Sequence, residues 1–152
     1  MPREIKIANT ISKLAREIAI KTPDFNHPKG AGVGDIATLI FMRTLRQHVE
    51  KTLGNRYAEK KICGNNNLTV DFYIPEEKTI IEVALGLKNP TSEFEKDVLK
   101  ALIAKENGCE VTQLIFLAKK GAIKKRSEPS SKAIISWAES NHEIKIQIKE
   151  LD

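Results

Sequence analysis

The chain of 152 residues has little of several residue types, and each shortage narrows what the protein can be. It has two cysteines, Cys63 and Cys109, which lie far apart, form no CxxC motif and have no neighbouring histidine. Zinc and redox chemistry therefore have little support, and two buried thiols are expected. No apolar run approaches the roughly 18 residues of a membrane span, and the N-terminus lacks the pattern of a secretory signal. A cytoplasmic protein without a membrane segment is the expectation.

Aromatic residues are also scarce, at 5% of the sequence, so there is little sign of the stacking platforms that bind single-stranded nucleic acid. The remaining composition, 41% hydrophobic and 30% charged, is that of an ordinary globular protein. A formal charge of +5 suits a polyanionic partner but is also common among proteins that bind none. At this length, residues 1–152 are expected to form a single domain with a sizeable core.

Hydrophobic periodicity predicts the secondary structure. Helices are expected where apolar residues recur every three or four positions, as at Ile7, Ile11, Leu14 and Ile18. Strands are expected where short runs rich in β-branched and aromatic residues alternate with polar ones. The predicted helices cover residues 3–21, 35–53, 91–107 (beginning at Thr91 or Ser92) and 129–140. The predicted strands cover residues 56–63, two hairpin arms within 67–85, 111–118 and 143–149.

The order of these elements predicts an α/β fold with a mixed central β-sheet flanked by helices. Strand 111–118 is mostly apolar, so we expect it to be buried on both sides. The helix 91–107 leads to it from the hairpin, and a helical crossover of this kind joins parallel strands. The hairpin strands are antiparallel, and helices are expected on both faces of the sheet. Strand 143–149 alternates charged and apolar residues, as an edge strand does.

Residues 22–34 (TPDFNHPKGAGVG) contain two prolines and three glycines, which predicts a loop. Glycine-rich backbone can approach a phosphate closely. However, the segment lacks the Lys-Ser/Thr of a P-loop, and the sequence predicts a helix before it where a nucleotide-binding α/β domain needs a strand. A connector is therefore the preferred interpretation, and a small-molecule or nucleotide site on this loop is the alternative.

The β-hairpin within residues 67–85 turns at the polar segment 75–78. Centring the loop on residues 76 and 77 fixes the cross-strand register. The expected pairs are Ile74 with Thr79, Phe72 with Ile81, and Asp71 with Glu82. One face of the hairpin then carries apolar side chains and is expected to be core, while the other face carries two facing acids.

Asp71 and Glu82 are the candidates for chemistry in this hairpin. Carboxylates directly opposite each other in an antiparallel pair, with Cβ atoms about 5 Å apart, repel each other. A divalent cation between them would offset the repulsion. Mg²⁺ (or Mn²⁺) is the expected ion, because hard cations take oxygen ligands from one or two carboxylates and keep waters for chemistry. The alternatives are a solvated surface pair or a register that differs by one residue.

A helix, a three-strand meander, a crossover helix and a parallel strand, with Asp71 on the second strand and Glu82 on the third, resemble the restriction-endonuclease-like, or PD-(D/E)xK, nuclease superfamily. The resemblance covers roughly residues 35–118, and its motif residues are Val70-Asp71 and Glu82-Val83-Ala84. It implies a restriction-endonuclease-like core (αβββαβ) with an extra N-terminal helix. No proline precedes Asp71, but that position is often replaced within the family.

Ala84 stands where the superfamily motif has its lysine. In such nucleases the lysine helps to position or activate the attacking water and to stabilise charge, so its absence implies a relocated lysine or lost activity. Lys88 and Lys96 are the candidates for relocation, with Lys100 one helical turn beyond Lys96. Glu95 is expected in the buried stripe of helix 91–107 as a third acid, unless it forms a capping box at the start of that helix.

The resemblance implies a Mg²⁺-dependent deoxyribonuclease of the restriction, repair or junction-resolving type. Asp71 and Glu82, with Glu95 or Glu50, would hold the ion, and a lysine would orient the attacking water. Duplex or branched DNA is the expected partner, and a chain this short often acts as a homodimer when both strands are cut. The cations expected to contact backbone phosphates are Lys119, Lys120, Lys124, Lys125 and Arg126. The alternative, based on Ala84, is a catalytically inactive nuclease-like domain that binds nucleic acid or a protein.

Overall fold

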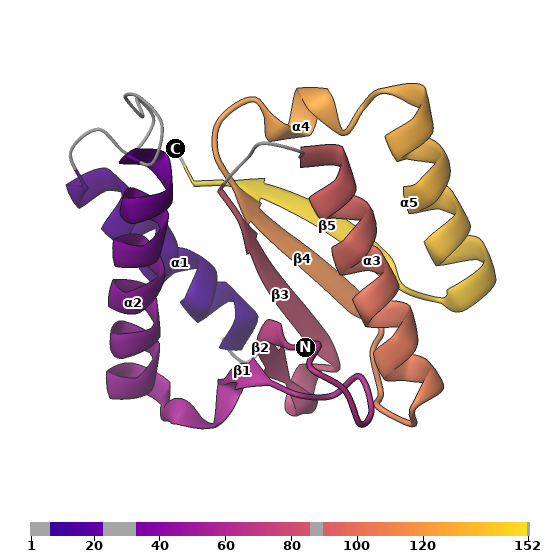
Figure 1. Ribbon diagram of the computed structural model, residues 1–152, viewed down its shortest axis with the longest axis horizontal. Coiled ribbons are helices and arrows are strands. Elements are labelled where there is room, and N and C mark those ends of the chain that lie inside the picture. The colour runs from indigo at the N-terminus through magenta and orange to yellow at the C-terminus, as the bar shows by residue number, and fades with distance from the viewer. Residues whose placement is uncertain (1–6, 23–32, 86–89, 152) are drawn as a thin grey trace, which may run out of the picture.

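The computed structural model describes residues 7–22, 33–85 and 90–151, which form a central β-sheet with helices on both faces (Figure 1). The helices are α1 (Ile7–Lys21), α2 (Val33–Leu53), α3 (Pro90–Glu106), α4 (Ala122–Lys125) and α5 (Pro129–His142). The strands are β1 (Ala58–Lys60), β2 (Val70–Ile74), β3 (Thr79–Ala84), β4 (Gln113–Ala118) and β5 (Lys145–Glu150). None of these helices is long and apolar enough to cross a membrane.

The sheet has five strands in the order β1-β2-β3-β4-β5. Strands β1, β2 and β3 form an antiparallel meander, while β3, β4 and β5 are parallel to one another. The helix α3 makes the crossover from β3 to β4, and α5 makes the one from β4 to β5. The predicted mixed sheet with flanking helices is therefore confirmed, as is the edge position of the last strand.

Two hydrophobic clusters lie on opposite faces of the sheet. On one face, α1 and α2 pack against β-strand side chains such as Phe72, Ile81 and Leu117. On the other face, α3 and α5 pack against another set that includes Ile80 and Phe116. Figure 1 shows the two helical layers separated by the sheet. The expectation that only one hairpin face is core is therefore wrong, because β3 and its neighbours are covered on both sides.

The hairpin has the predicted register, with Phe72 paired to Ile81 and Ile74 to Thr79. Its loop is a 3₁₀ turn over Pro75–Glu77, closed by Lys78 in the left-handed conformation. The Glu77 carboxylate accepts hydrogen bonds from the backbone N–H groups of Ile7 and Ala8. A carboxylate at a helix N-terminus satisfies otherwise unpaired N–H groups, so this contact fastens α1 to the hairpin.

Several predicted boundaries differ from the structure. The strand expected at residues 56–63 is reduced to Ala58–Lys60, because a 3₁₀ turn precedes it and Glu59 has a positive φ of 50° that disturbs extended pairing. The helix α2 begins at Val33, before the expected start at Asp35, and α3 begins at Pro90. The short helix α4 was not predicted. Most of the glycine-rich segment, residues 23–32, and Lys88 lie outside the described residues.

Candidate active site

Asp71 on β2 and Glu82 on β3 contact each other where the two strands stop pairing. The backbone ladder ends at Phe72 and Ile81, one step before the two acids. There the backbone N–H of Asp71 donates to Oε1 of Glu82 at 3.3 Å, and the backbone N–H of Val83 donates to Oδ2 of Asp71 at 2.8 Å. The predicted juxtaposition is therefore present, and each carboxyl group uses one oxygen to bind the opposite strand.

Lys100 on α3 places its ammonium group against this pair. Its Nζ lies 3.0 Å from Oε2 of Glu82 and 3.2 Å from Oδ1 of Asp97, one turn earlier on the same helix. It also donates a hydrogen bond to the backbone carbonyl oxygen of Thr69 at 2.8 Å. Oxygen atoms of Glu82, Asp97 and Thr69 thus surround the ammonium group at 2.8 to 3.2 Å and restrict its position.

The cluster is largely withdrawn from solvent. Glu82 is 1% exposed and Asp97 is 8% exposed. Oε2 of Glu82 is buried, and although Lys100 is near it, no donor in the described part of the chain reaches it with hydrogen-bond geometry. A buried polar atom without a good partner is costly, and a catalytic role or a bound ion is among the explanations for one in a native protein.

Three carboxyl groups are buried close together around one ammonium group, and this shifts the pKa values of all four groups. Burial raises the pKa of Glu82, and the nearby Asp97 and Asp71 raise it further, to about 9. Burial also raises the pKa of Asp97, to about 6, and that of Asp71. Burial lowers the pKa of Lys100, but Glu82 and Asp97 outweigh it and leave this pKa above its ordinary value. These shifts favour the protonated form of Glu82 and the charged form of Lys100.

The acid pair has oxygen atoms that are suitable ligands for a hard divalent ion. One oxygen of each carboxyl group is not used by the cross-strand hydrogen bonds, and carboxylate oxygens are the ligands that Mg²⁺ prefers. Within the described residues, no three side chains of His, Cys, Asp or Glu are arranged to hold a metal ion. The site thus offers two carboxyl groups, and a metal ion bound there would release the proton of Glu82, with water and substrate phosphate completing its coordination.

The other sequence candidates lie apart from this cluster. Glu95 and Lys96 are on α3 but are exposed, so the expected burial of Glu95 is wrong. Glu50 is exposed on α2. The buried stripe of α3 runs instead through Phe94, Asp97, Val98, Ala101 and Ala104. Sequence reasoning missed Asp97, although a carboxyl group within an otherwise apolar helical stripe was a detectable signal.

The predicted basic cluster follows β4 at the same end of the sheet as the acid pair. Ala118, its last strand residue, pairs with Ala84, two positions after Glu82. Figure 1 shows α4 at the same end as the start of α3. Lys120, Lys124 and Lys125 are exposed there. Lysines on this segment can therefore meet a polyanion that approaches this end of the sheet.

Arg126 differs from the lysines of this cluster. It is 7% exposed, and its guanidinium group lies over the ring of Phe94, 5.0 Å from the centroid. This cation–π contact joins the end of α4 to α3. The expectation that Arg126 contacts phosphate does not fit this burial, because the side chain serves the packing between two helices.

Comparison of the chain with protein-family models, with curated proteins and with solved structures finds no match. The geometry of the described residues is therefore the basis for a functional proposal.

Proposed function

We propose that this protein is a metal-dependent DNA endonuclease with a restriction-endonuclease-like core. The observation that carries the proposal is the position of Lys100, whose ammonium group reaches Glu82 beside Asp71. Lys100 brings a positive charge to the acid pair from α3, although Ala84 occupies the position on β3 where the superfamily motif has its lysine. A lysine beside paired carboxyl groups can serve metal-assisted phosphodiester hydrolysis, because the acids can hold the metal ion and the cation can stabilise negative charge on the phosphate.

In this proposal, Asp71 and Glu82 hold Mg²⁺ or Mn²⁺, which when bound polarises the phosphate and lowers the pKa of its water. Lys100 orients the attacking water and stabilises negative charge on the phosphate. Asp97 fixes Lys100 through the ion pair between them. The exposed lysines after β4 bind backbone phosphates without reading sequence, which suits a duplex or branched substrate.

The experiment that tests this proposal is a cleavage assay on linear, nicked and branched DNA with Mg²⁺, with Mn²⁺ and with a chelator. Wild-type protein should cleave only with a metal ion, and Asp71→Ala should abolish cleavage while far-ultraviolet circular dichroism stays unchanged. The matched control is Glu95→Ala, because Glu95 is exposed on α3 and should leave the rate unaltered. Cleavage retained by Asp71→Ala would contradict the assignment.

The basic segment gives a separate prediction about DNA affinity. Lys124→Ala with Lys125→Ala should weaken binding and reduce the slope of log K against log salt by about 2, because each phosphate contact contributes about 0.9. The control pair is Arg43→Ala with Lys51→Ala, which removes two exposed cations from α2 on the other face of the sheet. Fluorescence anisotropy over a salt series measures both slopes, and equal losses in the two variants would refute a localised interface.

A catalytically inactive nuclease-like domain is the second candidate, and the burial of Glu82 favours it together with Ala84. It would bind nucleic acid or a protein partner through the same surface. This candidate predicts salt-sensitive DNA binding without cleavage in either Mg²⁺ or Mn²⁺.

A further inference from the structure

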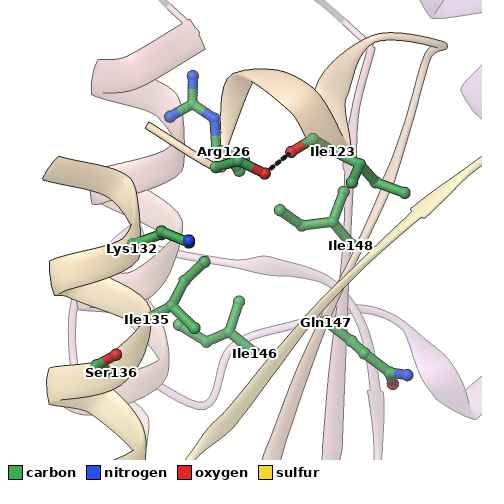
Figure 2. A pocket seen from close by; sticks show the side chains of 9 residues that line it. Ile123, Arg126, Lys132, Ile135, Ser136, Ile146, Gln147 and Ile148 are labelled. Carbon is green, nitrogen blue, oxygen red and sulfur yellow. Dashed lines mark hydrogen bonds between the residues drawn. The ribbon is translucent and has the colours of Figure 1, made fainter. Parts of the chain in front are cut away.

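A groove of about 590 Å³ lies between α4, α5 and β5. Its apolar lining is four isoleucines, Ile123, Ile135, Ile146 and Ile148, and Figure 2 shows these side chains gathered around one space, with Lys132 at its border. Ile123 is 50% exposed, which is high for a large apolar side chain. None of the acid-cluster residues lines this groove, so it is separate from the proposed active site.

The groove borders a strand with an open edge. Among the residues that the structure describes, β5 is the last strand of the sheet and pairs only with β4. The N–H of Lys145 donates to Thr112 at 3.0 Å and that of Leu151 donates to Ala118 at 2.8 Å. Backbone groups alternate in direction along a strand, so those of Ile146 and Ile148 point to the outer edge, where no strand lies among the described residues. These groups can pair with an added strand.

The charges around the groove and the edge are positive. Arg126 and Lys132 contribute to the lining, and no acid does so within residues 7–22, 33–85 and 90–151. Lys145 and Lys149 lie on β5 at alternate positions to the two isoleucines, so they belong to its opposite face. The one acid of β5, Glu150, accepts hydrogen bonds from the backbone N–H groups of Gly121 and Ile123. A complementary strand would therefore carry apolar residues on one face and acids on the other.

We propose that β5 and this groove bind an extended segment of a protein partner in which apolar and acidic residues alternate. The segment adds to β5 as a sixth strand, inserts its apolar side chains among the isoleucines and places its acids beside Lys145 and Lys149. A two-fold antiparallel pairing with a second copy that is centred on Gln147 is unfavourable, because it would set Lys145 opposite Lys149. The apolar lining likewise does not suit the phosphates of DNA.

The test uses a fluorescein-labelled peptide of alternating glutamate and valine, long enough to span β5, and measures anisotropy with the full chain. Saturable binding is expected, and Ile123→Glu should weaken it at least about tenfold. Because Ile123 is half exposed, this variant should keep its fold, which a thermal melt checks. The matched control is Leu39→Glu, at a 65% exposed position on α2, which should bind like the wild type.

Two further peptides define the mode of binding. A lysine–valine peptide should not bind, because its charge is reversed, and a glutamate–proline peptide should not bind, because proline cannot pair with the strand edge. In NMR spectra, the glutamate–valine peptide should shift the amide signals of Ile146 and Ile148. The proposal is overturned if no peptide saturates, if both variants bind equally, or if Ile123→Glu instead abolishes dimers or DNA binding and leaves peptide binding intact.

Discussion

Replacing Lys100 by methionine should lower the rate of Mg²⁺-dependent DNA cleavage by about 10² to 10³-fold, the loss typical of a charge-stabilising donor. The same change at Lys96, four residues earlier on α3, should leave the rate unaltered. Lys100 contacts Glu82 and Asp97, whereas Lys96 is exposed. Methionine keeps most of the length of the lysine side chain and removes its charge. The two variants therefore compare the same substitution at two positions on one helix.

The Lys100→Met variant must also be shown to fold, because removing one partner of a buried ion pair can cost about 3–5 kcal/mol. Burial raises the pKa of Glu82, so this side chain can take up a proton when the ammonium group is removed, which limits the cost. Circular dichroism and a urea titration at the assay temperature provide the check. A folded Lys100→Met protein that cleaves at the wild-type rate, or a Lys96→Met protein that does not cleave, would show that Lys100 is not the relocated lysine.

Replacing Glu82 by glutamine should abolish cleavage and, at pH 8 to 9, raise the free energy of unfolding by about 1 kcal/mol or more, because glutamine avoids the cost of ionising a buried acid. Glutamine has the shape of protonated glutamate, and Lys100 keeps Asp97 and the Thr69 carbonyl oxygen as partners. A loss of function accompanied by a gain in stability is the signature of a side chain that is retained for chemistry.

The sign of the pH dependence follows from the direction of the pKa shifts. Burial raises the pKa of Asp97 to about 6 and that of Glu82 to about 9, so the folded protein binds more protons than the unfolded chain across this range. These two acids should therefore make the free energy of unfolding of the wild type fall as the pH rises through 6 and towards 9. This decline should be shallower in Glu82→Gln.

Urea denaturation between pH 5 and 9 measures these profiles, with Glu95→Gln as the control because Glu95 is exposed. The control should keep the wild-type decline. If Glu82→Gln were less stable than the wild type at pH 9, or kept the same decline, Glu82 would not be the buried acid that the structure indicates.

The hairpin could be predicted from the sequence because its determinants are local. The polar segment 75–78 and the alternating arms set the register, and the register brings Asp71 to Glu82. The crossover helix and its parallel strand also follow from element order alone. The hairpin and its acid pair therefore depend on residues within one short stretch of chain.

The rotation of α3 about its axis could not be predicted in the same way. If Phe94, Val98 and Leu102 formed the buried stripe, Glu95 would face the sheet. In the structure, the buried stripe includes Asp97 instead. A small rotation of the helix therefore determines whether Glu95 or Asp97 is buried. That rotation is set by packing of α3 against the sheet. Arg126 illustrates the same limit, because its burial depends on Phe94, which lies 32 positions away in the sequence.

Calorimetric titration of Mn²⁺ into the wild type and into Asp71→Ala measures whether the acid pair binds a metal ion. We expect saturable binding of a single ion by the wild type and loss of that binding in Asp71→Ala. Absence of saturable binding by the wild type, or equal binding by the two proteins, would contradict a metal site at Asp71 and Glu82.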